Sequence, residues 1–264
     1  MFQLAAGSIA GTDHIRIGKN NQDAYYSLIF GETAIAVVCD GCGSGEHTEV
    51  GAKIGARLLV EAIAQILPLQ LTINYCLVEA QKRVLFHLRN LAKAMGGHLG
   101  QTVNDHFLFT IVGVIITPTG AAVFSLGDGV IIINGKIIQL GPFPGNAPPY
   151  LAYALLDSSP DLWELQVHQQ LPIDDIKSIL IGTDGVNDLI RLAEQNLPGK
   201  TEKIGAISQF WEQDRYFHNP DIVRRRLALI NSKVTKIDWE NQKTIKAAGL
   251  LPDDTTLIAI RKQP

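Results

Sequence analysis

Three short apolar segments of this sequence each end in the dipeptide Asp-Gly. Each segment is rich in strand-forming residues, so each predicts a buried strand that stops at a turn. Taken alone, Asp-Gly is a common turn, Asp128 directly precedes another strand, and Asp184 could simply cap a helix. Because several strand ends of one sandwich can meet at one edge, the repetition favours a fold that gathers these acids. The segments are residues 34–41, ending in Asp40-Gly41, residues 123–129, ending in Asp128-Gly129, and residues 179–185, ending in Asp184-Gly185.

The rest of the chain shows both strand and helix patterns. Apolar residues recur at helical spacing over residues 50–66 and 75–95, and each pattern stops near a Pro or a Gly pair. Asn134-Gly135 predicts a type I′ hairpin, since both central residues of that turn need positive φ. We expect a loop over residues 141–161 and a mostly helical stretch over residues 186–248. Strands are expected at residues 33–39, 107–116, 121–126, 130–133, 136–140, 165–171, 178–182 and 255–261.

This order of elements predicts an α+β fold with layers of helices and antiparallel sheets, not alternating βαβ units. The chain has 264 residues, of which 46% are hydrophobic, so it can bury a sizeable core. No internal repeat or long polar linker divides it, and we expect one domain over residues 1–264. Its 23 basic and 26 acidic side chains give a net charge of −3, which argues against a broad nucleic-acid-binding surface.

The sequence predicts a cytoplasmic protein that does not span a membrane. Three cysteines (Cys39, Cys42 and Cys76) cannot form a disulfide framework, so a reducing compartment fits best. The N-terminus has no basic residue ahead of its apolar stretch, unlike a secretory signal. Residues 106–127 carry no charged side chain apart from His106, but residues 117–120 divide them into halves shorter than the roughly 20 residues that a spanning helix needs.

Two further acidic positions lie in similar settings, namely Asp23 and the pair Asp253-Asp254 just before the last strand. If four or five of these carboxylates meet, two of them ~4 Å apart repel by about 4 kcal/mol at an effective dielectric constant near 20. Such a cluster needs protons or cations. Hard oxygen ligands without His or Cys favour Mg²⁺ or Mn²⁺ over zinc or copper. Two such ions flanking a shared hydroxide would suit in-line attack on phosphorus.

Five short motifs occur in order: residues 20–24 (NNQDA), 37–43 (VVCDGCG), 126–129 (LGDG), 182–188 (GTDGVND) and 253–256 (DDTT). Together they resemble the metal-dependent protein phosphatase family of the protein phosphatase 2C type, over about residues 7–261. The resemblance implies a four-layer αββα sandwich, in which helices flank two antiparallel sheets, with a site for two Mn²⁺ or Mg²⁺ ions at one edge. It also implies hydrolysis of phosphoserine and phosphothreonine in phosphorylated proteins by a hydroxide that bridges the two ions.

The resemblance assigns metal ligands by position. Asp40 would bridge the two ions, and the carbonyl group of Gly41 would ligate the first. Asp184 and Asp253 would ligate the second ion. Asp253 aligns with the family's ligand, whereas Asp254 stands where many relatives have Asn.

Two more acids receive roles from the resemblance. Asp128 matches an acid that helps to hold a weaker third ion in bacterial members. Asp23 would orient the attacking water from behind the ligands. Asp23 and Asp40 are therefore the predicted catalytic acids.

The phosphate-binding side of the site departs from the family pattern. Many relatives carry a phosphate-binding Arg five residues before the first motif's Asp, where this chain has Gly18. Arg16, Lys19 and His14 are candidates to replace it, and His14 is equally well explained as a structural residue bonded to a neighbouring loop.

A second departure is Cys42, at a position where other members carry His or Met. If a His there donates a proton to the leaving group, this protein lacks that donor. His47, five residues on, is a candidate to replace it, although the first turn of a helix is also an ordinary place for a structural His.

The remaining patterns have simple structural explanations. Cys39 and Cys42 have CxxC spacing but no second ligand pair, and we expect them to be small buried residues beside Asp40. The neighbouring glycines lack the sequence that follows a nucleotide-binding loop and would let backbone approach an ion. Residues 224–226 (RRR) predict a solvated helix face, or alternatively a contact for an acidic phosphopeptide. In relatives the variable region at about 187–250 includes a flap near the site, so we expect it to influence substrate choice.

Three functional hypotheses follow. The first is a Mn²⁺- or Mg²⁺-dependent serine/threonine phosphatase that acts on phosphorylated proteins. The alternative is a catalytically weak or inactive module of the same fold with a binding or regulatory role, because the expected Arg and His are missing. A third is hydrolysis of a small phosphorylated metabolite or nucleotide. We expect a monomer with no nucleic-acid or membrane partner.

Overall fold

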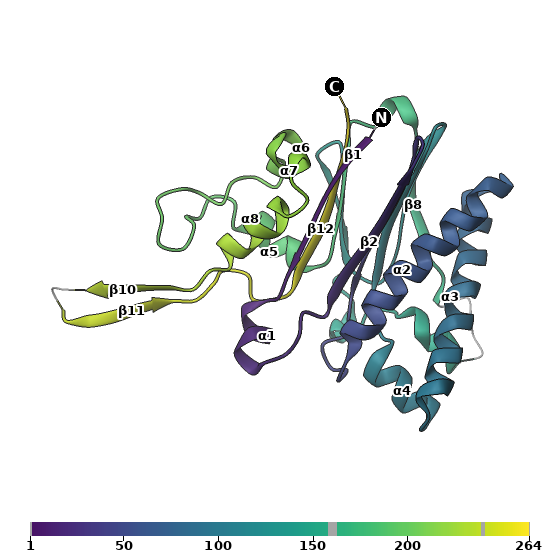
Figure 1. Cartoon of the computed structure of the whole chain (residues 1–264), viewed down its shortest axis with the longest axis horizontal. Helices are drawn as coiled ribbons and strands as arrows, with labels where there is room; N and C mark the ends of the chain where they lie inside the picture. The colour runs from purple at the N-terminus through teal and green to yellow at the C-terminus, as the bar shows by residue number, and fades with distance from the viewer. Residues whose placement is uncertain (1, 158–162, 239–240, 264) are drawn as a thin grey trace.

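The computed structural model of the chain describes residues 2–157, 163–238 and 241–263. Two five-stranded antiparallel sheets stack face to face, and helices cover the outer face of each (Figure 1). The first sheet has the order β1 (Phe2–Ile9), β12 (Thr255–Lys262), β9 (Ser178–Gly182), β6 (Gly129–Ile133) and β7 (Lys136–Leu140). The second has the order β2 (Asp23–Phe30), β3 (Thr33–Asp40), β4 (Ile111–Thr117), β5 (Gly120–Leu126) and β8 (Gln166–Pro172).

The central strands are apolar along their whole length because both of their faces are buried. Successive side chains of a strand point to opposite faces. In β3, Ala36 and Val38 therefore face the other sheet, whereas Ile35 and Val37 pack beneath the helices. The same alternation holds in the first sheet, and it produces three apolar layers: one between the sheets and one under each group of helices.

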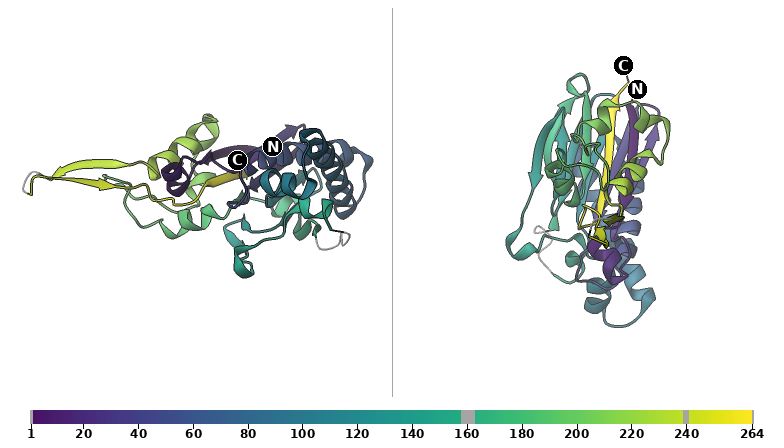
Figure 2. Two further views of the ribbon diagram at one scale, coloured as in Figure 1. Left: turned by 90° about the horizontal axis from the view of Figure 1, so that it is seen from below. Right: turned by 90° about the vertical axis from the view of Figure 1, so that its left-hand side faces the viewer.

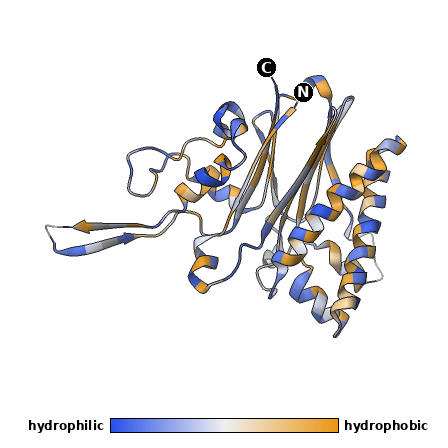
Figure 3. Ribbon diagram, viewed as in Figure 1, coloured by the Kyte–Doolittle hydropathy of each residue, from blue (hydrophilic) through white to orange (hydrophobic). Residues whose placement is uncertain are grey.

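The helices divide between the two outer faces, as the views in Figures 1 and 2 show. The second sheet is covered by α2 (Thr48–Ile66), α3 (Ile73–Met95) and α4 (Leu99–His106). The first is covered by α5 (Gly185–Arg191), α6 (Gln209–Glu212), α7 (Arg215–His218) and α8 (Ile222–Ile230). In Figure 3, α2 and α3 carry both hydrophobic and hydrophilic residues along their length, as helices with one buried face do. Short connecting turns are α1 (Thr12–Ile17), η1 (Leu67–Leu69), η2 (Pro144–Asn146), η3 (Leu151–Leu155) and η5 (Ile173–Asp175).

The predicted fold class is confirmed, and most of the predicted elements are present. Asn134 and Gly135 have φ values of 51° and 84°, as the type I′ turn between β6 and β7 requires. Thr72 begins α3 by accepting a hydrogen bond from the backbone N–H of Tyr75 at 3.3 Å. The Asn-Gly turn therefore predicted the β6–β7 hairpin correctly, and the spacing of apolar residues predicted α3.

Two predictions of secondary structure are wrong. The strand expected over residues 107–116 begins only at Ile111, and α4 precedes it. The stretch over residues 186–248 is mostly irregular rather than helical, and it contains a hairpin of β10 (Val234–Asp238) and β11 (Lys243–Ala247) that extends away from the sheets (Figures 1 and 2). β-Branched residues in both strands favour this hairpin over a helix. The loop expected over residues 141–161 contains η2 and η3, and its residues 158–162 lie outside the described part.

Within the described ranges, no helix combines the length and the apolar character that crossing a bilayer requires.

Helix α2 lies so close to the second sheet that Gly55 leaves no room for a side chain. A methyl group at Gly55 would lie 2.2 Å from Cζ of Phe109, whose side chain is buried.

We predict that Gly55→Ala lowers the free energy of unfolding by about 1–3 kcal/mol, as overpacking does, although Ala favours helix formation. Urea denaturation measures the change. Gly100→Ala in α4 is the matched control, because its methyl group would meet only the His98 ring, at 3.3 Å. Equal effects of the two substitutions would contradict the close packing at Gly55.

Candidate metal centre

The topology brings five acids from both sheets to one end of the sandwich. In the first sheet, β9 lies between β12 and β6 and is antiparallel to both, so its C-terminal end adjoins their N-terminal ends. Asp184 follows β9, Asp128 precedes β6, and Asp253 precedes β12. In the second sheet, Asp23 at the start of β2 pairs directly with Asp40 at the end of β3. Residues separated by more than two hundred positions therefore meet at one edge.

Four of these acids line one cavity of about 390 Å³. Its wall contains Asp40, Asp128, Asp184 and Asp253. Asp23 is not among the described wall residues and is only 3% exposed. The other described residues of the wall are His14, Gly41, Cys42, Gly43, Ser44, Thr110, Gly145, Pro148 and Tyr150. No Lys or Arg is among them, so the described part of the wall offers carboxylates without a compensating side-chain cation.

Burial and mutual repulsion make these carboxylates hard to ionise together. Burial raises the pKa of Asp184 to about 7, and the charges of Asp253 and Asp128 add to the effect. The pKa of Asp40 is raised well above its ordinary value, first by burial and then by the charges of Asp23 and Asp184. Burial also raises the pKa values of Asp128 and Asp253. Raised carboxyl pKa values from burial and like charges mark a site that binds protons or cations strongly.

Asp23 is held behind the cavity by the first sheet. Its Oδ2 accepts a hydrogen bond from Oγ1 of Thr183 at 2.7 Å, while its buried Oδ1 has no partner in the described part of the protein. Burial raises the pKa of Asp23 well above its ordinary value, and the charge of Asp254 adds to this. An unpartnered buried carboxylate oxygen is costly, so this atom lacks the donor that such a group needs within the described part of the protein.

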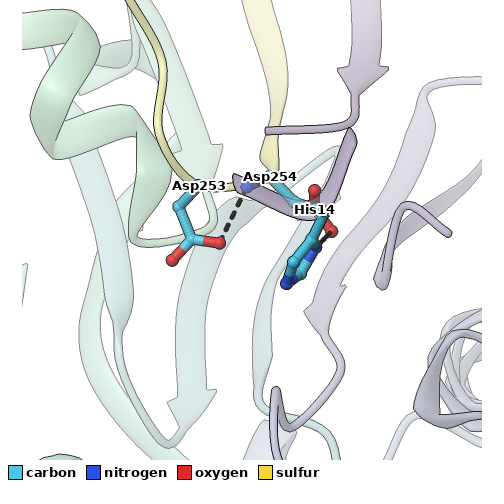
Figure 4. A group of neighbouring side chains, drawn as sticks. All are labelled: His14, Asp253 and Asp254. Carbon is cyan, nitrogen blue, oxygen red and sulfur yellow. Dashed lines mark hydrogen bonds and ion pairs between the residues drawn. The ribbon is translucent and has the colours of Figure 1, made fainter. Parts of the chain in front are cut away.

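Asp253 and Asp254 have different surroundings although they are adjacent (Figure 4). Asp254 is 2% exposed, and both of its carboxylate oxygens are already occupied by N–H groups, from Gly11 at 2.7 Å, Gln22 at 2.6 Å and His14 at 2.9 Å. Asp253 lines the cavity and accepts only the backbone N–H of Asp254, at 2.8 Å, among its described hydrogen bonds. Although His14, Asp253 and Asp254 offer ligand atoms within 4.8 Å of one another, the N–H groups around Asp254 leave Asp253 as the better ligand.

Gly41 is needed because the backbone is tightly enclosed at this point. Its N–H donates to the carbonyl oxygen of Gln22 at 3.1 Å. A methyl group at Gly41 would lie 2.8 Å from Oγ1 of Thr48 and 2.9 Å from the oxygen of Gln22. The segment after Asp40 can therefore follow the cavity wall closely only without a side chain.

Of the basic residues proposed for substrate binding, only His14 lines the cavity. Arg16 is 75% exposed and pairs with Asp13 on the surface. His47 is 55% exposed and stacks on His106, with ring centroids 5.6 Å apart. Lys19 donates to the carbonyl oxygen of Gly43 and is not among the described residues of the wall. Arg16 and His47 are therefore not among the described residues of the wall that carries the acids, and their predicted role in substrate binding stays a prediction.

The structure also shows where two of the cysteines and the basic run at residues 224–226 lie. Cys39 is buried, as expected, but Cys42 is half-buried and faces the cavity, and both thiols are free. Arg224 and Arg225 bind Asp221 on the surface, while Arg226 is largely buried against Glu202. This basic run therefore has local structural partners and does not reach the acids.

Some wall residues were not predicted. Thr110 lies in the predicted strand segment 107–116 and Tyr150 in the predicted loop 141–161, but neither pattern points to the site, so only the tertiary structure reveals that they line the cavity. Residues 187–250, the predicted flap-like region, contribute none of the described wall of this cavity, but Asp188 and Arg191 line an adjoining one of about 260 Å³. Asp188 stands four residues after Asp184 on α5, and this i,i+4 spacing was a usable signal.

A larger cavity, of about 820 Å³, opens at the opposite end of the second sheet, where Thr33 begins β3 and Thr117 ends β4. Its described lining has no ionisable side chain. It therefore lacks acids, bases and ion ligands, and the smaller acidic cavity is the better candidate for a reaction site.

Comparisons with known proteins agree with this geometry. The family model of protein phosphatase 2C matches residues 10–223. The fold is similar to that of a C. elegans sex determining protein, with a TM-score of 0.55 and 12% identity. This match covers 100% of this chain and 65% of the other chain. It is also similar to the serine/threonine phosphatase Stp1 from Staphylococcus aureus (TM-score 0.52, 14% identity, 100% and 96% covered). The catalytic domain of the serine/threonine protein phosphatase PstP, in complex with two manganese ions, gives a TM-score of 0.54 at 12% identity, with 98% and 97% covered.

No curated protein matches the sequence, and the chain spans about two thirds of the first of these structures. At such low identities the structural similarities establish the fold alone. The family match covers far more than half of the chain. This protein therefore belongs to the protein phosphatase 2C family.

Proposed function

We propose that this protein is a metal-dependent phosphatase that hydrolyses phosphoserine and phosphothreonine in phosphorylated proteins. The observation that carries the proposal is the convergence of Asp40, Asp128, Asp184 and Asp253 on one open cavity, with Asp23 buried behind it. Similarity to two serine/threonine phosphatases, one of them bound to two manganese ions, supports the same activity. Three free cysteines are compatible with the predicted cytoplasmic location.

The described residues fit divalent cations well. The donors are carboxylate oxygens, which suit Mg²⁺ and Mn²⁺. The pKa values of Asp40 and Asp184 are raised by burial and by neighbouring carboxylates. A bound cation would therefore offset the repulsion between these carboxylates. The absence of Lys and Arg from the described wall leaves ions as the natural counter-charge.

We assign Asp40, the carbonyl group of Gly41, Asp184 and Asp253 as ligands of two ions, with Asp128 helping to hold a weaker third. When bound, such ions supply an activated water and stabilise the charge that develops on the phosphoryl oxygens. Asp23 orients the attacking water through its unpartnered Oδ1. Thr183 keeps Asp23 in place by donating to its other carboxylate oxygen.

A protein substrate suits this cavity better than a nucleotide or a small metabolite. Its described wall contains one aromatic side chain, Tyr150, and no Lys or Arg to hold a base or extra phosphates. A phosphorylated side chain needs only a site for its phosphoryl group, with the rest of the peptide outside. The main competing function, a phosphopeptide-binding module without turnover, is motivated by Gly18 and Cys42 at positions where the family pattern has Arg and His or Met.

The first test is activity. We predict hydrolysis of p-nitrophenyl phosphate and of a phosphoserine peptide in Mn²⁺, with loss of activity in EDTA. Asp40→Asn should lower kcat by about 10²-fold or more, the effect of removing a preorganised charged group. Asp174→Asn, at a carboxylate 91% exposed, is the control and should leave kcat unchanged. Full activity of the Asp40→Asn protein would contradict the assignment, whereas calorimetric phosphopeptide binding without turnover would support the binding module.

The second test is the pH dependence of stability. Without ions, the folded pKa of Asp184, about 7, exceeds the ordinary value near 3.9. Between these values the folded protein binds more protons than the unfolded chain, so the carboxylates lower the free energy of unfolding as pH rises from about 4 to about 7. We predict that Mn²⁺ raises the melting temperature more at pH 8 than at pH 5, because ions bind only to the ionised carboxylates of the folded state.

The variant Asp184→Asn separates this effect from general stabilisation. Removing one of the repelling charges should raise the melting temperature of the ion-free protein at pH 8 and should reduce the increase caused by Mn²⁺. Asp174→Asn should respond to Mn²⁺ as the unmodified protein does. An Asp184→Asn protein with an unchanged response to Mn²⁺ would exclude Asp184 as a ligand.

A further inference from the structure

The ladder between β2 and β3 ends at Gln22 and Gly41 with a pair that is only half formed. In an antiparallel ladder, the two residues of a hydrogen-bonded pair exchange two bonds, each N–H donating to the other residue's carbonyl oxygen. The register that pairs Asp23 with Asp40 puts these two residues opposite each other. The N–H of Gly41 does donate to the oxygen of Gln22, at 3.1 Å. The reciprocal bond is replaced, because the N–H of Gln22 donates to Oδ2 of Asp254, at 2.6 Å.

This exchange leaves the carbonyl oxygen of Gly41 without a hydrogen bond among the described residues, although Gly41 lines the acidic cavity. The oxygens of Asp40 and Cys42, on either side, each accept one. The N–H of Cys42 donates to the oxygen of Leu108 at 2.9 Å. Because the C=O and N–H of a planar trans peptide group point in opposite directions, that bond fixes the direction of the Gly41 carbonyl group. A fixed backbone carbonyl group is a ligand that suits Mg²⁺ and Mn²⁺.

We propose that Asp254 is a positioning residue for the metal site: by accepting the N–H of Gln22, it keeps the carbonyl oxygen of Gly41 available to an ion. This inference rests on the proposed phosphatase function, in which that oxygen is a ligand. The carboxylate competes well for this N–H, because hydrogen bonds to an ionised acceptor are shorter and stronger than those between neutral peptide groups. Without the carboxylate, the N–H would close the pair with Gly41. An oxygen bonded within the ladder is a poorer ligand, because the bond draws on its lone pairs and holds it toward β2.

The carboxylate of Asp254 is held in the orientation that this role needs. Its Oδ1 accepts the N–H of Gly11 at 2.7 Å, which leaves Oδ2 facing Gln22. Nδ1 of His14 also lies 2.9 Å from Oδ2, and Asp254 is 2% exposed. Asp253, by contrast, lines the cavity. The two adjacent acids would thus serve one site in different ways, Asp253 as a ligand and Asp254 by keeping another ligand available.

Gln22 is itself fixed beside Gly41. It is fully buried, and its Nε2 donates to Oγ1 of Thr48 at 2.5 Å. That hydroxyl group donates in turn to the carbonyl oxygen of Cys42, at 3.0 Å. The N–H of Gln22 therefore stays within reach of the Gly41 oxygen, and only a second acceptor can hold it away.

The first test detects the hydrogen bond of Gln22 directly, on the isotope-labelled full chain. Scalar coupling through a hydrogen bond connects the ¹⁵N of the donor to the ¹³C that carries the acceptor oxygen. In the ion-free protein, we expect coupling from the Gln22 amide to Cγ of Asp254 and none to the carbonyl carbon of Gly41. In Asp254→Ala, coupling to Gly41 should appear. Coupling of Gln22 to Gly41 in the unmodified protein would overturn the proposal, whether or not the variant folds.

The second test is ion affinity, measured by calorimetry with Mn²⁺. Asp254→Ala should weaken binding by about 10-fold or more, as the loss of a group behind a metal ligand does. Asn231→Ala is the matched control. Asn231 is also buried and joins the same two segments, since it donates to the oxygen of Ala10 and accepts the N–H of Leu251, but none of its described hydrogen bonds reaches Gly41. This control should lower the melting temperature of the ion-free protein and leave the Mn²⁺ affinity unchanged.

Mg²⁺, which unlike Mn²⁺ is not paramagnetic, shows whether Asp254 is itself a ligand. On saturation with Mg²⁺, the coupling from Gln22 to Asp254 should persist and the carbonyl ¹³C signal of Gly41 should shift. Loss of that coupling would make Asp254 a ligand and overturn the proposal. An unchanged Mn²⁺ affinity in Asp254→Ala, or an equal loss in Asn231→Ala, would overturn it as well. If the unmodified protein binds neither ion, the proposed function fails and this inference fails with it.

Discussion

The repulsion between five carboxylates at one end of the sandwich is the interaction on which the functional account depends. Each of them lies at or beside the end of a strand, and strand order brings them together because β9 runs antiparallel between β12 and β6. Folding therefore forces negative charges into a partly buried space, which raises the pKa values of Asp40 and Asp184. The apolar layers of the sandwich offset that cost, and cations would remove it.

The same geometry places the acids in two different environments. Those at the cavity wall are reachable by ions, whereas Asp23 and Asp254 are buried and bonded to neighbouring groups. The carboxylate oxygens of Asp254 accept hydrogen bonds from Gly11, Gln22 and His14, so this residue connects three segments of the chain. Asp253 and Asp254 are adjacent and have the same side chain, yet only Asp253 lines the cavity because their backbone surroundings differ.

Much of the fold, and part of the candidate site, could be predicted from the sequence. The apolar runs, the Asn134-Gly135 turn and the helical spacing over α2 and α3 follow from local rules, and the repeated strand-Asp-Gly unit indicated where acids would gather. The hairpin β10–β11 was missed because its exposed strands lack a strong hydrophobic pattern. The positions of Tyr150, Arg16 and His47 relative to the cavity depend on loop paths that local patterns do not determine. His14 was identified as a candidate, but its bond to Asp254 spans 240 residues and appears only in the folded chain.

The proposed function requires that the acidic cavity bind divalent cations through Asp40, Asp184 and Asp253. Diffraction at the manganese absorption edge, from crystals grown with Mn²⁺, measures this most directly. We expect at least two anomalous peaks in the cavity, with Asp40 in contact with both and Asp184 and Asp253 in contact with one. An absence of peaks there, with these carboxylates facing solvent or bound to protein groups instead, would contradict it.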